Sequence, residues 1–403
     1  MELFWLEHKK LWRKKIVKIC VLLCFVYCVI FGSILSFQWF CFGSSDDYTS
    51  AFGNNFDGYT VIKDSQEYAL SFGGELTDET LQQIVSDYQQ MEADGMEEEL
   101  EKTDWQIVNS WLGTLYPELR DTSNYKTMIS YVDPDKLTGF YERRQQVLDE
   151  FLEVSGQVGA EKEFLHQMER KVEKPFHYEW VEGWSTLLGS MVADLGVVMA
   201  LFLGIVLSSL FAGEWRDNTS TLVLTTRNGW GKIALAKILT GLAFTVELFA
   251  LLAVSNVISQ LFFMGTAGWD MPIQNIKLIA VAPMNMLQAE IYEYAFVLLG
   301  AIGFAGIVMF ISAAVKNNVL TLLLSLAVVY GPMMIAEYLP YEMQKALDLI
   351  PLVGSSTDIF RTNTFRILGK LIWSPYLLIT IPVLIGILCM PFAIKSWSRR
   401  MKA

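Results

Sequence analysis

Residues 294–336 read YAFVLLGAIGFAGIVMFISAAVKNNVLTLLLSLAVVYGPMMIA, two uncharged runs on either side of a single lysine, Lys316. A helix that crosses a bilayer needs about 20 mostly apolar residues. Residues 294–315 and 317–336 both reach that length, and Lys316 with Asn317 leaves room only for a tight turn at the membrane surface. This stretch therefore predicts two consecutive membrane-spanning helices that run in opposite directions.

The remainder of the chain contains four more apolar runs of the same kind. The six predicted spans are residues 19–42, 185–212, 236–264, 294–315, 317–336 and 371–394. The composition agrees, because 53% of the 403 residues are hydrophobic and only 18% are charged, which argues against an ordinary soluble protein. The predicted fold class is an all-α polytopic membrane protein with six transmembrane helices.

The acidic residues are concentrated in one segment, residues 43–184, between the first two spans. This insert holds 30 of the 43 Asp and Glu but only 11 of the 31 Lys and Arg, so the net charge of −12 is an average over two very different parts. Its length suffices to bury a core of its own. Thr77 and Asp133-Pro134 are predicted helix starts. A helical stripe follows the first of them: Leu81, Ile84, Val85 and Tyr88. We predict a mostly helical, water-exposed domain.

Lysines and arginines near the span ends predict the orientation, because cytoplasmic loops carry the excess of both. Fifteen lie on the side of the two termini and five in the two short loops opposite. Both termini are therefore expected in the cytoplasm, and the acidic insert outside the cell. The segments between spans are an amphipathic interfacial helix at residues 1–18, a cytoplasmic loop at 213–235, outer loops at 265–293 and 337–370, the latter with short helices, and a cytoplasmic tail at 395–403.

The chain lacks the sequence motifs of the common enzymes. No GxxxxGK[ST], HExxH or GxSxG occurs, and none of the three histidines is near a cysteine in the sequence. We therefore expect no nucleotide site, no metal site and no catalytic activity in this chain. The charge distribution likewise predicts no nucleic-acid partner.

Two acids and three glycines stand out within the spans. Asp194 and Glu247 are costly at membrane depth, so they need an explanation. They line a substrate path, or one of them takes up a proton; the structural alternatives are a hydrogen bond between helices and a protonated carboxyl. Gly300, Gly303 and Gly306 lie on roughly one helix face, which predicts close approach of a neighbouring helix.

The most informative stretch is FAGEWRDNTSTLVLTTR, residues 211–227, at the predicted cytoplasmic exit of the second span. Glu214, Thr219 and the following apolar cluster, with Lys237-Ile238-Leu239 entering the third span, resemble the ABC-2 type transporter permeases. The basic N-terminal helix, the six spans and the long last outer loop are also similar to that family. Asn218 and Arg227-Asn228-Gly229-Trp230 depart from the family pattern, and the large insert leaves the substrate undefined.

The resemblance implies a type V ABC exporter-like fold and a coupling helix in this loop. Glu214 would be its acidic anchor, and the residues near the ATPase would be Arg216, Thr219, Thr221, Thr225 and Arg227. ATP and Mg²⁺ would bind in two separate ATPase subunits, which this chain would join together with a second permease chain, identical or related. The expected setting is the bacterial cytoplasmic membrane and its lipid, and the expected cargo a hydrophobic or amphipathic peptide, drug or lipid.

Two other functions fit the sequence. In a mechanotransmission permease, ATP hydrolysis would move the insert against an envelope partner; such chains typically have four spans, which disfavours this reading. A membrane receptor or immunity protein would use the insert to bind a ligand and would need no ATPase.

Overall fold

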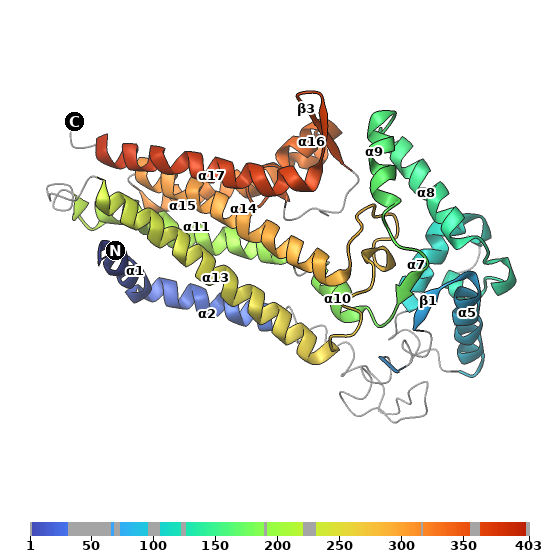
Figure 1. Ribbon diagram of the computed structural model, residues 1–403. Coiled ribbons are helices and arrows are strands. Elements are labelled where there is room, and N and C mark those ends of the chain that lie inside the picture. The colour runs from blue at the N-terminus through green and yellow to red at the C-terminus, as the bar shows by residue number, and fades with distance from the viewer. Residues whose placement is uncertain are drawn as a thin grey trace.

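The computed structural model describes residues 2–30, 66–67, 73–95, 105–121, 126–188, 192–220, 231–315, 317–354 and 363–399. Helices dominate these ranges, and two small antiparallel sheets accompany them. The chain forms a long helix bundle that carries the acidic insert at one end (Figure 1). We call this the insert end, and we call the opposite end, where α1 begins and α17 finishes, the termini end.

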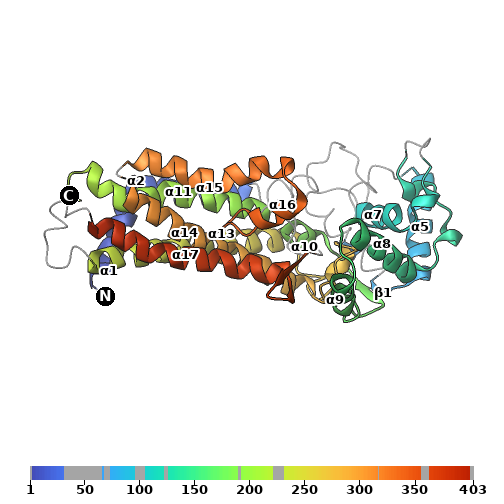
Figure 2. The ribbon, with the colours of Figure 1, turned by 90° about the horizontal axis from the view of Figure 1, so that it is seen from above.

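Five helices of the described residues are long and apolar enough to cross a membrane, which marks the chain as a multi-pass membrane protein. They are α11 (Val192–Arg216), α13 (Lys232–Met264), α14 (Met286–Ala314), α15 (Asn318–Ile335) and α17 (Ser374–Arg399). Figure 2 shows them running side by side along the length of the bundle. The first predicted span, residues 19–42, lies half outside the described residues, which end here at residue 30, and α2 (Lys15–Val29) contains its described part.

The fourth predicted span begins earlier than its uncharged run. Asn285 caps α14: its side chain accepts a hydrogen bond from the backbone N–H of Gln288, and the Gln288 side chain accepts one from the backbone N–H of Asn285. The helix therefore starts at Met286 instead of residue 294. Glu290 and Glu293, which precede the uncharged run, lie on this helix and are buried. The helix is therefore longer than the predicted span, because charged residues do not end it.

Two other boundaries also differ from the prediction. α13 begins at Lys232, before the predicted residue 236, since the helix extends beyond the apolar run. Residues 371–373 do not belong to the last span, because β4 (Lys370–Trp373) pairs antiparallel with β3 (Thr364–Ile367). α17 starts directly after this hairpin and continues to Arg399.

The predicted close approach at the glycines of α14 is confirmed. A Cβ atom on Gly303 would lie 2.3 Å from the carbonyl oxygen of Pro382 in α17, and one on Gly306 would lie 2.5 Å from that of Gly386. No side chain fits between these backbones. The glycines therefore set the distance between α14 and α17, as small residues do in membrane bundles.

The insert domain, by which we mean the described part of residues 43–184, is mostly helical. Its helices are α5 (Asp78–Ala93), α7 (Trp105–Leu115), α8 (Phe140–Val154) and α9 (Ala160–Glu169), and β1 (Gly74–Leu76) pairs with β2 (Phe176–Tyr178). The predicted cap is confirmed, since the Thr77 hydroxyl accepts the N–H of Thr80, and so is the buried stripe that begins at Leu81. Asp133 also caps a helix that has Pro134 at its first position, as predicted, but this is a short 3₁₀ helix that ends at Lys136, and α8 starts only at Phe140.

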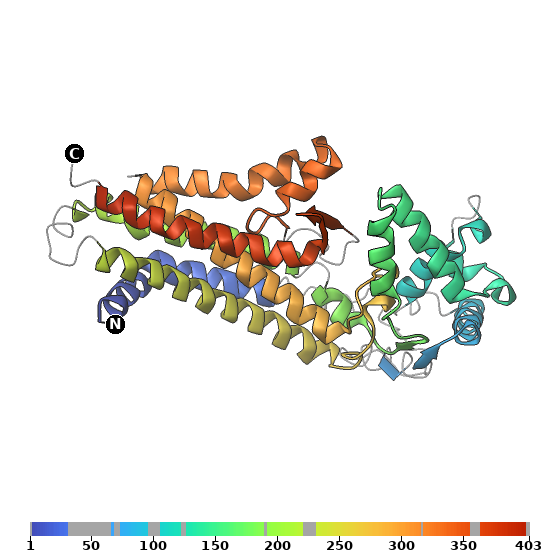
Figure 3. The ribbon, with the colours of Figure 1, turned by 45° about the horizontal axis from the view of Figure 1, so that its top comes forward.

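The last outer loop contains the short helices that the sequence predicts. They are η7 (Ala336–Tyr338) and α16 (Tyr341–Leu347). The β3–β4 hairpin of the same segment was not predicted, and it extends from the insert end next to α16 (Figure 3).

A buried arginine fastens the insert domain to the loop between α13 and α14. Arg144 is fully buried, and its guanidinium donates to the carbonyl oxygens of Leu278 at 2.7 Å and Ala280 at 3.1 Å. It also donates to Glu169 at 2.6 Å. Burial raises the pKa of Glu169, but hydrogen bonds from Lys174 and Arg144 outweigh it and bring the pKa below its usual value. The predicted outer loop 265–293 therefore forms part of the base of the insert domain.

Replacing Arg144 is expected to loosen this base. In Arg144→Met the Glu169 carboxylate loses its buried partner, so the free energy of unfolding should fall by about 3 kcal/mol or more. Thermal unfolding of the full chain in detergent measures this. Arg170→Met is the matched control, because Arg170 and its partner Glu163 are both exposed, and an exposed pair contributes only about 0–1 kcal/mol. Equal effects of the two substitutions would contradict the assignment.

Candidate functional site

Glu214 lies at the termini end of α11, where three helices meet. Its side chain is only 5% exposed, and its Oε1 accepts from Nζ of Lys10 in α1 (Glu2–Arg13) at 2.5 Å. The same oxygen accepts from Nζ of Lys237 in α13 at 2.8 Å, and the Thr219 hydroxyl donates to Oε2. One carboxylate thus ties the N-terminal helix to two membrane helices.

Lys237 is the second centre of this arrangement. It is 1% exposed, and besides Glu214 it donates to Oε2 of Glu7 at 2.8 Å and to the carbonyl oxygen of Leu210 at 3.1 Å. A buried charge is tolerated only when it is paired and hydrogen-bonded, and all three donors of this ammonium group have acceptors. We call Glu7, Lys10, Glu214, Thr219 and Lys237 the Glu214 cluster.

The way in which α11 ends brings Thr219 back to Glu214. Asn218 adopts φ 54°, in the left-handed region, and the N–H of Thr219 donates to the carbonyl oxygen of Glu214 at 3.0 Å. Glycine and asparagine are the residues that tolerate this conformation after a helix. Asparagine at position 218 therefore permits this turn.

A serine hydroxyl connects this end of α11 to α14. Oγ of Ser312 accepts the N–H groups of Phe211 and Ala212, both at 3.1 Å, and donates to the carbonyl oxygen of Ser208 at 2.7 Å. A side chain inserted in this way into a helix hydrogen-bond ladder is a typical site of bending. These bonds lie within one helical turn of Glu214, so they link the Glu214 cluster to α14, the helix that packs most closely on α17.

Lys14, between α1 and α2, adds a further positive charge near the Glu214 cluster. Its Nζ donates to Oγ of Ser209 at 3.0 Å. Burial, together with the positive charges of Lys237 and Lys10, lowers the pKa of Lys14 to about 8. Below pH 8 the charged lysine therefore costs stability.

Removing this charge is expected to stabilise the fold in a pH-dependent way. Lys14→Met should raise the free energy of unfolding by about 1–2 kcal/mol at pH 7, after allowance for partial solvent screening. The gain should shrink as the pH rises from about 8, where the folded lysine loses its proton, towards 10.5, where the unfolded one does. Thermal unfolding at pH 7 and pH 10 measures it, and a gain that is absent or independent of pH would contradict this account.

The structure brings together only part of the predicted coupling residues. Glu214 and Thr219 are in contact, and Arg216 is exposed at the end of α11, where it pairs with Asp217 at 2.9 Å. Thr221, Thr225 and Arg227 lie outside the described residues. The sequence did not predict the contacts of Lys10 and Lys237 with Glu214, because Lys10 indicated only the orientation and Lys237 formed part of the family resemblance.

The two predicted intramembrane acids have different surroundings. Glu247 accepts from Nε1 of Trp12 at 3.0 Å and lies 3.2 Å from Nε2 of His8, so it joins α13 to α1. The structural alternative, a hydrogen bond between helices, fits Glu247. Asp194 is exposed in the first turn of α11, where a negative charge is favoured by the helix dipole. No hydrogen bond or ion pair joins these two acids within the described ranges.

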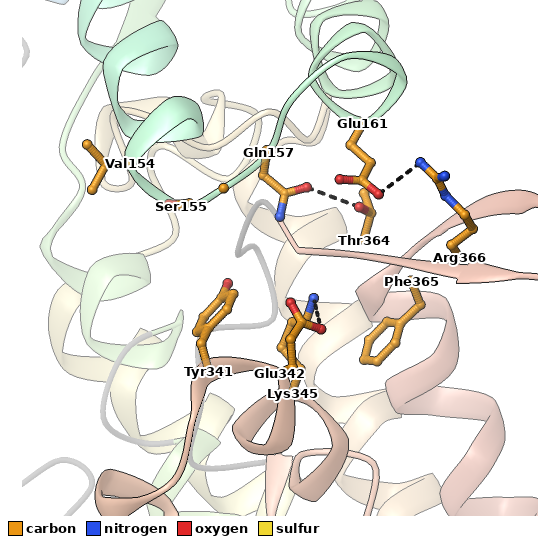
Figure 4. Close-up of a pocket in the computed structure, with 11 residues that line it drawn as sticks. Val154, Ser155, Gln157, Glu161, Tyr341, Glu342, Lys345, Thr364, Phe365 and Arg366 are labelled. Carbon is orange, nitrogen blue, oxygen red and sulfur yellow. Dashed lines mark hydrogen bonds and ion pairs between the residues drawn. The ribbon is translucent and has the colours of Figure 1, made fainter.

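A polar cleft of about 740 Å³ opens at the insert end, between the α8–α9 turn and the last outer loop. Figure 4 shows two links across it: Thr364 to Gln157 at 3.1 Å and Arg366 to Glu161 at 3.3 Å. Lys345 lines its floor, is 8% exposed and pairs with Glu342. Its walls come from distant parts of the sequence, which is why no sequence pattern indicated it.

A scan against protein-family models finds no match to this chain, and neither a search of characterised proteins nor a search of solved structures finds one.

Proposed function

We propose that this chain is the permease subunit of an ABC exporter of the ABC-2 type. In this proposal residues 19–42 form a sixth span, the termini end faces the bacterial cytoplasm and the insert domain lies outside. The chain has no nucleotide motif, so ATP hydrolysis belongs to two separate ATPase subunits. A second permease chain, identical or related, completes the complex, and the cargo is hydrophobic or amphipathic.

The observation that carries this proposal is the Glu214 cluster. A subunit driven by a partner needs a point where the partner's motion reaches several helices at once. Glu214 bonds to α1 through Lys10 and to α13 through Lys237, and it lies on the last turn of α11, just before the segment that resembles a coupling helix. A push on that segment would displace all three helices together.

The bonds of Ser312 offer the continuation of this path. They join the end of α11 to α14, and the glycines of α14 hold α17 in backbone contact. Movement of α11 would therefore be passed to the centre of the bundle instead of being absorbed by loose side chains. Tightly packed elements with few alternative arrangements are the ones that carry such coupling.

The base of the insert domain supports a second candidate, a mechanotransmission permease. Arg144 and the indole of Trp111, which donates to the carbonyl oxygen of Asn275 at 2.9 Å, bind the insert domain to the α13–α14 loop. Motion of those helices would then move the insert domain as one body. Both candidates need an ATPase at the termini end; a receptor or immunity protein does not.

Site-specific crosslinking tests the proposal. A photo-crosslinking amino acid is incorporated into the chain, which is then irradiated in native membranes. One variant carries it at position 216, where the arginine is exposed beside the predicted coupling segment. The other carries it at position 338, where the tyrosine is 85% exposed at the insert end. Position 216 should capture a polypeptide whose peptides include a GxxxxGK[ST] sequence, and position 338 should not. Capture of no such polypeptide at position 216, or equal capture at both positions, would overturn the proposal.

A further inference from the structure

Three side chains with metal-binding atoms meet at the base of the insert domain. His177 lies on β2, Glu179 follows it, and Asp270 comes from the loop between α13 and α14. Their donor atoms all lie within 4.8 Å of one another, and Nε2 of His177 is 3.0 Å from Oε1 of Glu179. The sequence predicts no metal site here because Asp270 is remote along the chain.

Backbone and side-chain bonds hold two of these residues in place. Oε2 of Glu179 accepts the N–H of Gly268 at 3.0 Å, which leaves Oε1 directed at the imidazole. The side chain of Asn275 donates to the carbonyl oxygen of His177 at 2.6 Å. Gly268 has φ 79°, and a Cβ there would lie 2.4 Å from the carbonyl oxygen of Trp180, so only glycine permits this approach. The ligand set is thus positioned by the fold.

A second feature of the same place also indicates a ligand. His177, Asp270 and Gln274 line one pocket of about 320 Å³. Gln274 is fully buried; its amide nitrogen donates to two carbonyl oxygens, at 2.8 and 3.0 Å, but its Oε1 accepts no hydrogen bond from any described residue. Buried polar atoms without a partner are uncommon and usually face an ordered water or an ion.

We propose that His177, Glu179 and Asp270 bind a divalent transition-metal ion of the Zn²⁺ type. One imidazole with two carboxylates suits Zn²⁺, whereas Ca²⁺ and Mg²⁺ prefer oxygen ligands alone. In a tetrahedral zinc site the donor atoms are about 3.4 Å apart, so the His177–Glu179 distance of 3.0 Å needs only a small side-chain rotation. His177 and Asp270 are exposed, so a water or a ligand group can occupy the fourth position.

The ion would have a mechanical consequence. It would bridge the insert domain, through His177 and Glu179, and the α13–α14 loop, through Asp270. Because a metal binds the folded protein and not the unfolded chain, it stabilises the folded protein by an amount that grows with the logarithm of its concentration over the dissociation constant.

Metal titration of the full-length protein in detergent tests this proposal. Zn²⁺ binding is measured by calorimetry after treatment with a chelator, and Co²⁺ is added separately because its visible absorption reports four-coordinate ligation. We expect one saturable Zn²⁺ site per chain and at least a tenfold loss of affinity in both His177→Gln and Asp270→Asn. His166→Gln is the matched control, because His166 also faces a carboxylate, Asp149 at 2.9 Å, but belongs to no three-ligand group among the described residues.

The outcomes separate a specific site from an accidental one. Because the side chains of His177 and Asp270 are exposed, we expect both metal-free variants to unfold at the same temperature as the metal-free wild type. This measurement shows that the variants are folded. The absence of saturable binding to the wild type would overturn the proposal. So would full affinity in His177→Gln and Asp270→Asn, or an equal loss in His166→Gln.

Discussion

In Glu214→Gln, ATP hydrolysis by the proposed complex of this chain with ATPase subunits is expected to fall at least tenfold, while the proposed ATPase subunit still co-purifies. The amide has no charge with which to hold Lys10 and Lys237 together, so α1, α11 and α13 no longer move as a unit. A tenfold loss of rate corresponds to a rise of about 1.4 kcal/mol in the activation free energy. The measurement is the rate of ATP hydrolysis by the purified complex in lipid nanodiscs.

A double variant distinguishes lost coupling from lost stability. Removing Glu214 alone leaves the Lys237 ammonium buried with fewer acceptors, which costs folding free energy. The double variant Glu214→Met, Lys237→Met removes both of these buried charges. Its unfolding temperature should therefore be higher than that of the Glu214 single variant, whereas its rate of ATP hydrolysis should stay low. Glu163→Gln, which alters an exposed pair in the insert domain, should match the wild type. A wild-type rate in either cluster variant would contradict the role of the Glu214 cluster.

The second large effect is expected at the contact between α14 and α17. In Gly306→Leu the new side chain would occupy the place of the Gly386 backbone, and in Gly303→Leu that of Pro382. Backbone atoms cannot rotate away as a side chain can, so the helices must separate. We expect a loss of at least about 3 kcal/mol and of the monodisperse peak in size-exclusion chromatography of the detergent extract.

Gly331→Leu is the control for this pair of variants. Gly331 also lies in an apolar helix, α15, but a Cβ there meets no atom within 4 Å. This variant should elute like the wild type. If Gly303→Leu and Gly306→Leu did the same, the close contact between α14 and α17 would be wrong.

Features that depend on neighbouring residues in the sequence could be predicted. The tight turn after α14 follows from Asn317, which accepts the N–H groups of Val319 and Leu320 and so starts α15 at once. The helical stripe from Leu81 to Tyr88 and the spacing of the α14 glycines have the same local origin. Apolar length and helical periodicity suffice for these features.

Features that depend on distant residues could not be predicted. Glu214 was selected as a lone acid, yet its environment is made by Lys10 and Lys237, which the sequence places in two other segments. The capping box at Asn285 starts α14 at Met286, so Glu290 and Glu293 fall within the helix. A pattern of hydropathy alone contains neither effect.

The composition of the complex in its native membrane tests the central claim most directly. The full-length chain is extracted with mild detergent and its intact assembly is weighed by native mass spectrometry. The account predicts two permease chains together with two subunits that carry a GxxxxGK[ST] sequence and bind ATP. An assembly without any nucleotide-binding subunit would contradict it.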